Sequence, residues 1–137
     1  MKKISYQRKV NAFNLQEMLV VLVIIGILIL IALPSLMPLI SKAKSVEAQV
    51  QLKHIYNVER TYFFMYSKYS TDFNEIGFET PKSVTENGNS NYEYEVTLAT
   101  NNTFKARATA VTDFDGDGIF NVWEIDHDQQ LKELVKD

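Results

Sequence analysis

Residues 9–36 read KVNAFNLQEMLVVLVIIGILILIALPSL, and most of this stretch is apolar. No charged side chain occurs between Met18 and Ser41, and Leu, Ile, Val and Met make up almost all of the run as far as Leu33. A helix of about 20 apolar residues crosses the hydrocarbon core of a bilayer. The run therefore predicts a membrane-spanning helix close to the N-terminus.

A short basic segment precedes the apolar run. It holds four cationic side chains and no acid: Lys2, Lys3, Arg8 and Lys9. Because basic residues flanking a membrane helix stay on the cytoplasmic side, the rest of the chain is expected to cross the membrane. We predict a cleaved basic leader at 1–12 and a hydrophobic transmembrane or filament-core helix at 13–41.

The helix is expected to continue beyond the membrane. Apolar side chains recur at helical spacing between charged ones, from Ala48 through Leu52 and Ile55 to Tyr66, which predicts an amphipathic helix at 42–69. Pro34 and Pro38 each remove a backbone donor, so the sequence also predicts a kink or local melting there.

The remaining residues, 70–137, change to a β pattern. Turn-forming residues fill 70–90, and apolar and polar side chains then alternate from Tyr92 to Ala99. Further strands are predicted at 104–111 and 119–125. We predict an α+β fold, in which a long N-terminal α-helix packs on a small antiparallel β-sheet of about three to four strands in a β-rich headpiece.

Composition excludes several kinds of site. The chain has 14 basic and 17 acidic residues, so removal of the leader leaves 10 basic residues and a net charge of −7. An acidic product of this kind lacks the cationic surface that neutralises nucleic-acid phosphates. The chain has no cysteine, which excludes disulfides and thiolate metal sites.

Glu17 is an isolated acid at the edge of the apolar run. An acidic side chain near the middle of a membrane costs about 2.5–3.5 kcal/mol, and less near the interface, so its presence calls for a partner. Cleavage between Ala12 and Phe13 would create a cationic amine one helical turn from this carboxylate. An ordinary signal anchor or secretory signal with a chance acidic residue is the alternative.

The stretch from Lys9 to Met18 resembles the class III leader and N-terminal helix of type IV pilins and the related pseudopilins. In that family a small residue precedes a Phe, and a Glu is the fifth residue after the cut. The resemblance continues more loosely through 60–64 and 69–72. The family usually has Gly where Ala12 stands, so cleavage here is expected to be slower, and Thr where Asn14 stands, which bears only on packing near the mature terminus.

The resemblance implies specific roles for four residues. A prepilin peptidase would cut between Ala12 and Phe13 and N-methylate Phe13, while Glu17 would pair with the terminal amine of an adjacent subunit during assembly. Pro34 also fits the family pattern and is expected to matter for assembly.

The resemblance further implies a structural subunit rather than an enzyme. It would wait in the bacterial inner membrane as a precursor, and then polymerise with identical or related pilins into an extracellular type IV pilus used for adhesion, twitching motility or DNA uptake. The implied partners are the prepilin peptidase, an assembly ATPase and an inner-membrane platform protein. The alternatives are a pseudopilin of a type II secretion system and a monomeric membrane-tethered calcium-binding module.

A second motif lies at residues 113–124, which read DFDGDGIFNVWE. It has the oxygen-ligand spacing of an EF-hand calcium loop, with a glycine at the sharp turn. Six residues are the predicted ligands: Asp113, Asp115, Asp117, Ile119, Asn121 and Glu124. A strand precedes this loop where an EF-hand has a helix, so the alternative is a solvated turn stabilised by Asp side chains. No cofactor other than calcium is expected.

Overall fold

A computed structural model describes residues 12–137, so all of the predicted leader except Ala12 lies outside the described residues. The chain divides into two compact units, which we call the N-terminal unit (described residues 12–35) and the folded unit (residues 36–137). The elements are α1 (Leu15–Tyr66), α2 (Phe73–Ile76), a 3₁₀ turn (Val84–Glu86), β1 (Tyr92–Ala99), β2 (Phe104–Ala110), β3 (Val122–Asp126) and β4 (Leu131–Val135).

Helix α1 confirms the predicted long helix but has slightly different ends. It begins at Leu15 and ends at Tyr66, where Ser67 adopts a φ of 55° that an α-helix cannot continue through. The backbone remains helical at both Pro34 and Pro38, so the predicted local melting does not occur. Each proline removes only one helical hydrogen bond, and the surrounding Leu and Ala residues favour the helix.

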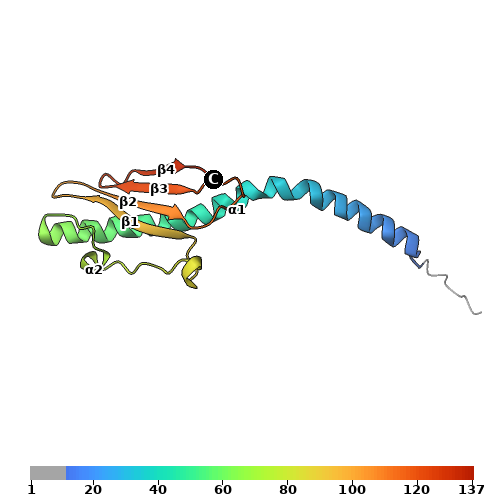
Figure 1. Cartoon of the computed structure of the whole chain (residues 1–137), viewed down its shortest axis with the longest axis horizontal. Coiled ribbons are helices and arrows are strands. Elements are labelled where there is room, and N and C mark those ends of the chain that lie inside the picture. The colour runs from blue at the N-terminus through green and yellow to red at the C-terminus, as the bar shows by residue number, and fades with distance from the viewer. Residues whose placement is uncertain (1–11) are drawn as a thin grey trace, which may run out of the picture. The chain divides into compact units, whose positions relative to one another are not determined.

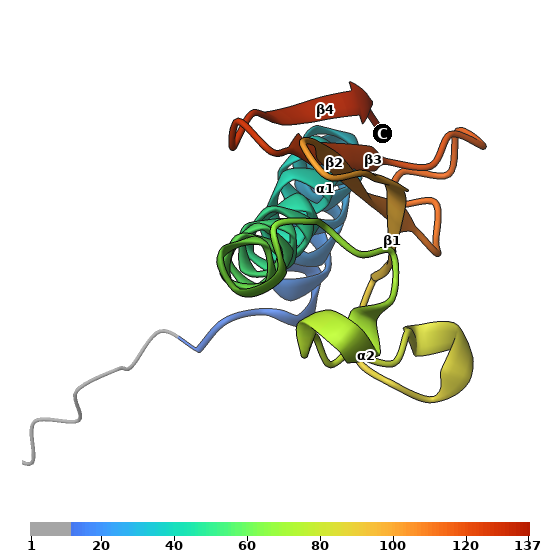
Figure 2. The ribbon, with the colours of Figure 1, turned by 90° about the vertical axis from the view of Figure 1, so that its left-hand side faces the viewer.

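The four strands form an antiparallel sheet in the order β1-β2-β3-β4. The sheet confirms the predicted α+β class, and β1 and β2 lie where the alternating pattern placed them. The third strand starts at Val122 rather than Ile119, because Ile119 and Phe120 belong to an exposed loop. In the folded unit the sheet lies along α1 (Figure 1), whereas the segment with α2 lies on another side of the helix (Figure 2).

The core of the folded unit forms between α1 and the sheet. The helix contributes Leu52 and Ile55, both fully buried, and the sheet contributes the fully buried Tyr92 and Phe104. Small side chains occupy β2, one of the two inner strands, where the buried residues include Ala106, Ala108 and Ala110. Their size allows the helix to approach the sheet closely, so the predicted amphipathic face does pack against the strands.

Two carboxylates on α1 hold the ends of the loop between α1 and β1. The Glu47 carboxylate accepts hydrogen bonds from the backbone N–H of Asn91 at 3.0 Å and from the Ser90 hydroxyl at 2.7 Å. The Glu59 carboxylate accepts one from the backbone N–H of Ser70 at 3.2 Å. These bonds satisfy backbone donors that a loop packed against a helix could not otherwise pair.

Glu59 is fully buried, and its Oε1 has no hydrogen-bond partner among residues 12–137. Burial raises the pKa of this carboxyl from 4.5 to about 7, and the bond from Ser70 opposes that rise. The folded state therefore binds more protons than the unfolded state between these two values.

The pH dependence of stability tests this environment. Protonation of Glu59 stabilises the fold fully below the unfolded pKa of 4.5, and this contribution is lost as the pH rises through about 7. The free energy of unfolding is expected to fall by about 1–3 kcal/mol over that range. Glu59→Gln should abolish this fall in denaturant titrations of the full chain in detergent micelles. The exposed Glu95→Gln should retain it, and parallel pH profiles for wild type and Glu59→Gln would contradict the assignment.

Candidate functional site

The predicted assembly residues lie at the start of α1. Ala12, Phe13 and Asn14 precede the helix, and Glu17 lies in its first turn. The backbone N–H of Asn14 donates a hydrogen bond of 3.0 Å to Glu17 Oε2, while the N–H of Glu17 and that of Met18 both donate to the Asn14 carbonyl. Glu17 thus closes one half of a capping box.

This backbone partner of Glu17 was missed in the sequence. The signal that could have found it is the spacing of Asn14 and Glu17, because an acid three residues after an N-cap residue often reaches back to the N-cap N–H. A negative charge in the first turn is also favoured by the helix dipole. The carboxylate has about four lone-pair sites, so one bond from Asn14 leaves capacity for a further donor such as an amine.

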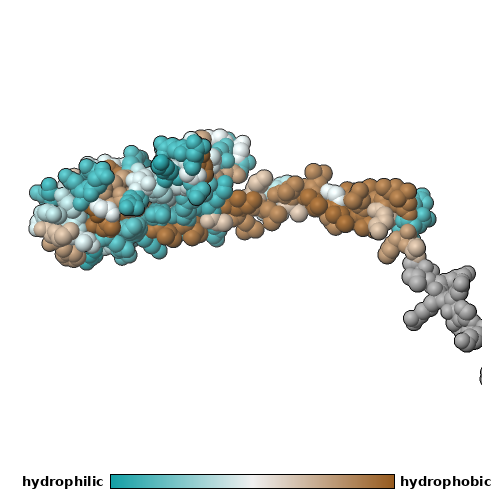
Figure 3. Space-filling view, turned by 90° about the horizontal axis from the view of Figure 1, so that it is seen from below, coloured by the Kyte–Doolittle hydropathy of each residue, from teal (hydrophilic) through white to brown (hydrophobic). Residues whose placement is uncertain are grey.

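The helix that follows Glu17 exposes its apolar side chains. Leu22 is 68% exposed and Leu30 is 72% exposed, and Pro34 is also exposed. Phe13, which precedes the helix, is 77% exposed. Among the described residues, α1 is the one helix long and apolar enough to cross a membrane, and its most apolar window is wholly unburied. Figure 3 shows hydrophobic residues along this part of α1 and mostly hydrophilic residues on the folded unit. Such a surface needs lipid or other apolar helices around it.

The second candidate site is the Asp-rich loop between β2 and β3. The carboxylates of Asp113, Asp115, Asp117 and Asp137 offer oxygen atoms that all lie within 4.8 Å of one another. Asp137 was missed in the sequence, since it is distant along the chain and no local pattern marks it. It is held beside the loop by the backbone N–H of Phe114, which donates to Asp137 Oδ2 at 2.9 Å.

Asp113 organises the turn of this loop. Its two carboxylate oxygens accept hydrogen bonds of 2.6 Å from the backbone N–H groups of Gly116 and Gly118. These donors, Gly118 foremost, lower the pKa of Asp113. Both glycines have φ values of 85–87°, which residues with a Cβ rarely adopt. The loop therefore has the local Asp-to-backbone bonds that a solvated turn would show.

The other predicted calcium ligands have different partners. Asn121 is fully buried, where its Oδ1 accepts from the Tyr92 hydroxyl at 2.7 Å and its Nδ2 donates to Glu133 Oε1 at 2.7 Å. Glu124 pairs with Lys105 and Arg107, each at 3.1 Å. Ile119 is exposed and its N–H donates to Asp117 Oδ1 at 2.7 Å. The structure thus brings three of the six predicted residues together and engages Asn121 and Glu124 elsewhere.

No family model matches the chain. The chain is 37% identical over 89 residues to the "Type IV major pilin protein PilA" of Myxococcus xanthus (strain DK1622). The match covers 65% of this chain but only 38% of that relative, so the chain spans well under half the length of the protein it resembles.

Proposed function

From its homology to a type IV major pilin, which supports its place in the type IV pilin family, we propose that this chain is a structural subunit that polymerises through its apolar helix. The observation that carries the proposal is the exposed apolar surface of α1, which starts next to a single acid. A non-enzymatic role is in keeping with that relative. The proposed sequence of events is cleavage of a precursor, storage in the inner membrane and assembly into a surface filament.

The contacts of Glu17 suggest how cleavage would prepare assembly. Before cleavage, the carboxylate accepts from the backbone N–H of Asn14. Cleavage between Ala12 and Phe13 would add a cationic amine one residue before Asn14, within reach of the same carboxylate or of a carboxylate on a neighbouring chain. A charged acid buried among apolar helices is strongly destabilising when unpaired, so a pairing amine would favour the assembled state.

The apolar side chains would supply most of the attraction between subunits outside the membrane. When the helix leaves the membrane, its apolar side chains lose the lipid that had covered them. Packing against the helices of neighbouring subunits then keeps these side chains out of water. The filament core would consist of 13–41 from many copies, and the acidic folded units would face solvent. The partners proposed for this route are the prepilin peptidase, an assembly ATPase and a platform protein.

A pseudopilin of a secretion system would use the same helix, acid and leader. Adhesion, twitching motility and DNA uptake are the downstream uses proposed for a pilus. Extended surface filaments would favour the pilin, whereas a secretion defect without them would favour the pseudopilin.

Substitution of Glu17 tests the proposed assembly step. Glu17→Ala is expected to leave membrane insertion intact, because it removes a charge from the edge of the apolar run. It should lower the yield of sheared filaments by about tenfold or more, since a loss of 1.4 kcal/mol per contact already corresponds to that factor. Gln16→Ala, the adjacent change, is the matched control and should assemble normally. Normal filament yield from Glu17→Ala would contradict the proposal.

We also propose that the Asp-rich loop binds calcium, on the strength of its four converging carboxylates. Extracellular calcium sites have dissociation constants of about 10⁻⁴–10⁻³ M, so calcium at about 1 mM should stabilise the folded unit by about 0.4–1.4 kcal/mol. A thermal melt of the full chain in micelles, with calcium or with a chelator, measures this gain. The double variant Asp115→Asn/Asp117→Asn should lose the calcium response without losing stability in chelator, because it relieves repulsion. Identical melts for the wild-type chain would leave the solvated turn as the account of this loop.

A further inference from the structure

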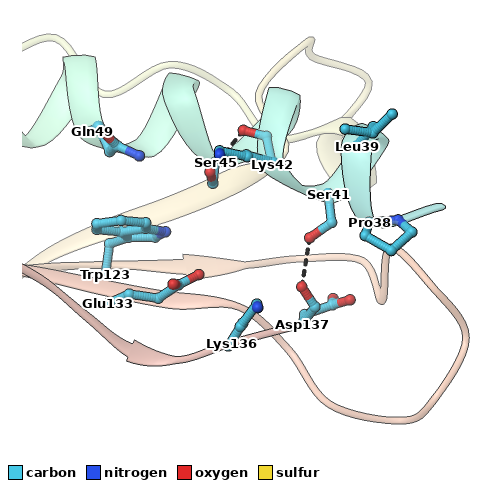
Figure 4. Close-up of a pocket in the computed structure, with 10 residues that line it drawn as sticks. All are labelled: Pro38, Leu39, Ser41, Lys42, Ser45, Gln49, Trp123, Glu133, Lys136 and Asp137. Carbon is cyan, nitrogen blue, oxygen red and sulfur yellow. Dashed lines mark hydrogen bonds between the residues drawn. The ribbon is translucent and has the colours of Figure 1, made fainter. Parts of the chain in front are cut away.

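A pocket of about 390 Å³ lies inside the folded unit, between α1 and the strands β3 and β4. On the helix side it is lined by Ser41 and Ser45, whose side chains are small, and on the sheet side by Trp123. Figure 4 shows the two serines across the pocket from the strands. The short serine side chains leave the space that a larger side chain would fill opposite the indole ring. Its volume is within the range of small-molecule sites, about 300–1,000 Å³.

Trp123, which lines the pocket, carries a hydrogen-bond donor that has no partner among residues 12–137. This donor is the indole Nε1, which is buried. A buried donor without a partner costs about 1–3 kcal/mol, and most native proteins avoid it. An acceptor on a bound molecule would remove that cost.

Charged side chains of both signs surround this donor. Glu133 is the cross-strand partner of Trp123 in the β3–β4 pair, which places it on the same face of the sheet. Figure 4 shows Glu133 and Lys136 pointing from the C-terminal segment toward the helix. Lys42 adds a second cation, and Asp137 lines the pocket beside Ser41, whose hydroxyl donates to the Asp137 carbonyl at 2.6 Å. The Asp137 carboxylate belongs to the Asp-rich loop, so the pocket itself has two cations and one acid, Glu133. A molecule with one anionic and one cationic group matches this lining better than a simple anion does.

The pocket begins where the apolar run ends. Pro38 and Leu39 line it and belong to the uncharged segment that stops at Ser41, directly before Lys42. When that segment spans a bilayer, residues one turn beyond its end lie at the depth of the lipid headgroups. Tryptophan and lysine are the residues favoured at that depth.

We propose that this pocket binds the headgroup of a zwitterionic phospholipid, phosphatidylethanolamine, while the chain is anchored in the membrane. The phosphate accepts from the Trp123 N–H and is neutralised by Lys42 and Lys136. The ammonium donates to Glu133 Oε2, since Glu133 Oε1 already accepts from Asn121. Choline lacks an N–H and cannot make that last bond, so the site distinguishes the two headgroups. The inference rests on the membrane-anchored stage of the proposed function.

Trp123 is the one tryptophan in the chain, so its fluorescence reports on the pocket directly. The full chain is reconstituted in vesicles of phosphatidylcholine alone or of phosphatidylcholine mixed with phosphatidylethanolamine, and quenching by acrylamide is measured. Phosphatidylethanolamine is expected to lower the quenching constant by about half, because a bound headgroup covers the indole. The double variant Lys42→Ala/Lys136→Ala should lose this protection. Lys132→Ala, an exposed lysine on β4 outside the pocket, should retain it.

Vesicle flotation on the same samples distinguishes failure of membrane anchoring from failure of headgroup binding. A chain that does not float with the vesicles contradicts the membrane-anchored stage, and with it this site. A chain that floats but shows equal quenching in both lipids overturns the headgroup site alone. The headgroup site is also overturned if the protection of Trp123 from acrylamide depends on protein concentration and not on phosphatidylethanolamine content, since a second copy of the chain would then occupy the pocket. Protection retained in the Lys42→Ala/Lys136→Ala variant has the same consequence.

Discussion

The carboxylate of Glu17 at the edge of an uncharged run constrains the rest of the molecule. A charge in that position needs a donor at every stage, because neither lipid nor packed apolar helices can solvate it. In the described chain the donor is the backbone N–H of Asn14, which makes Glu17 part of the helix start. The same carboxylate can therefore shape α1 in the precursor and later meet an amine in the filament, which is the role we propose for it.

A similar solution recurs along α1. Glu47 and Glu59 also accept from backbone N–H groups, those of Asn91 and Ser70, and so fasten both ends of the loop that leads from α1 to β1. The chain has no cysteine to hold this loop. The carboxylates of Glu47 and Glu59, which are half-buried and buried, hold the loop instead. Burial raises the pKa of the Glu59 carboxyl. Loop attachment in this fold is thus tied to the protonation of a helix side chain.

The uncharged apolar run was enough to predict the first half of the helix. Periodicity was enough to predict its second half, the first two strands and the α+β class, because these segments each bury one continuous face. Strand β4 was harder to predict, since it is an edge strand whose Lys132, Glu133 and Leu134 are all exposed.

Contacts between residues distant along the chain could not be predicted from the sequence. Asp137 beside the Asp-rich loop is one example, and the buried amide of Asn121 between Tyr92 and Glu133 is another. Spacing alone had assigned Asn121 to calcium, whereas the fold uses its amide inside the core.

The most direct test of the central claim is the N-terminal mass of the protein taken from surface filaments. If Glu17 acquires its partner through proteolysis, mass spectrometry should find a chain that starts at Phe13 and carries one methyl group on its amine. A chain in those filaments that still begins at Met1, with its four basic leader residues attached, would contradict the account.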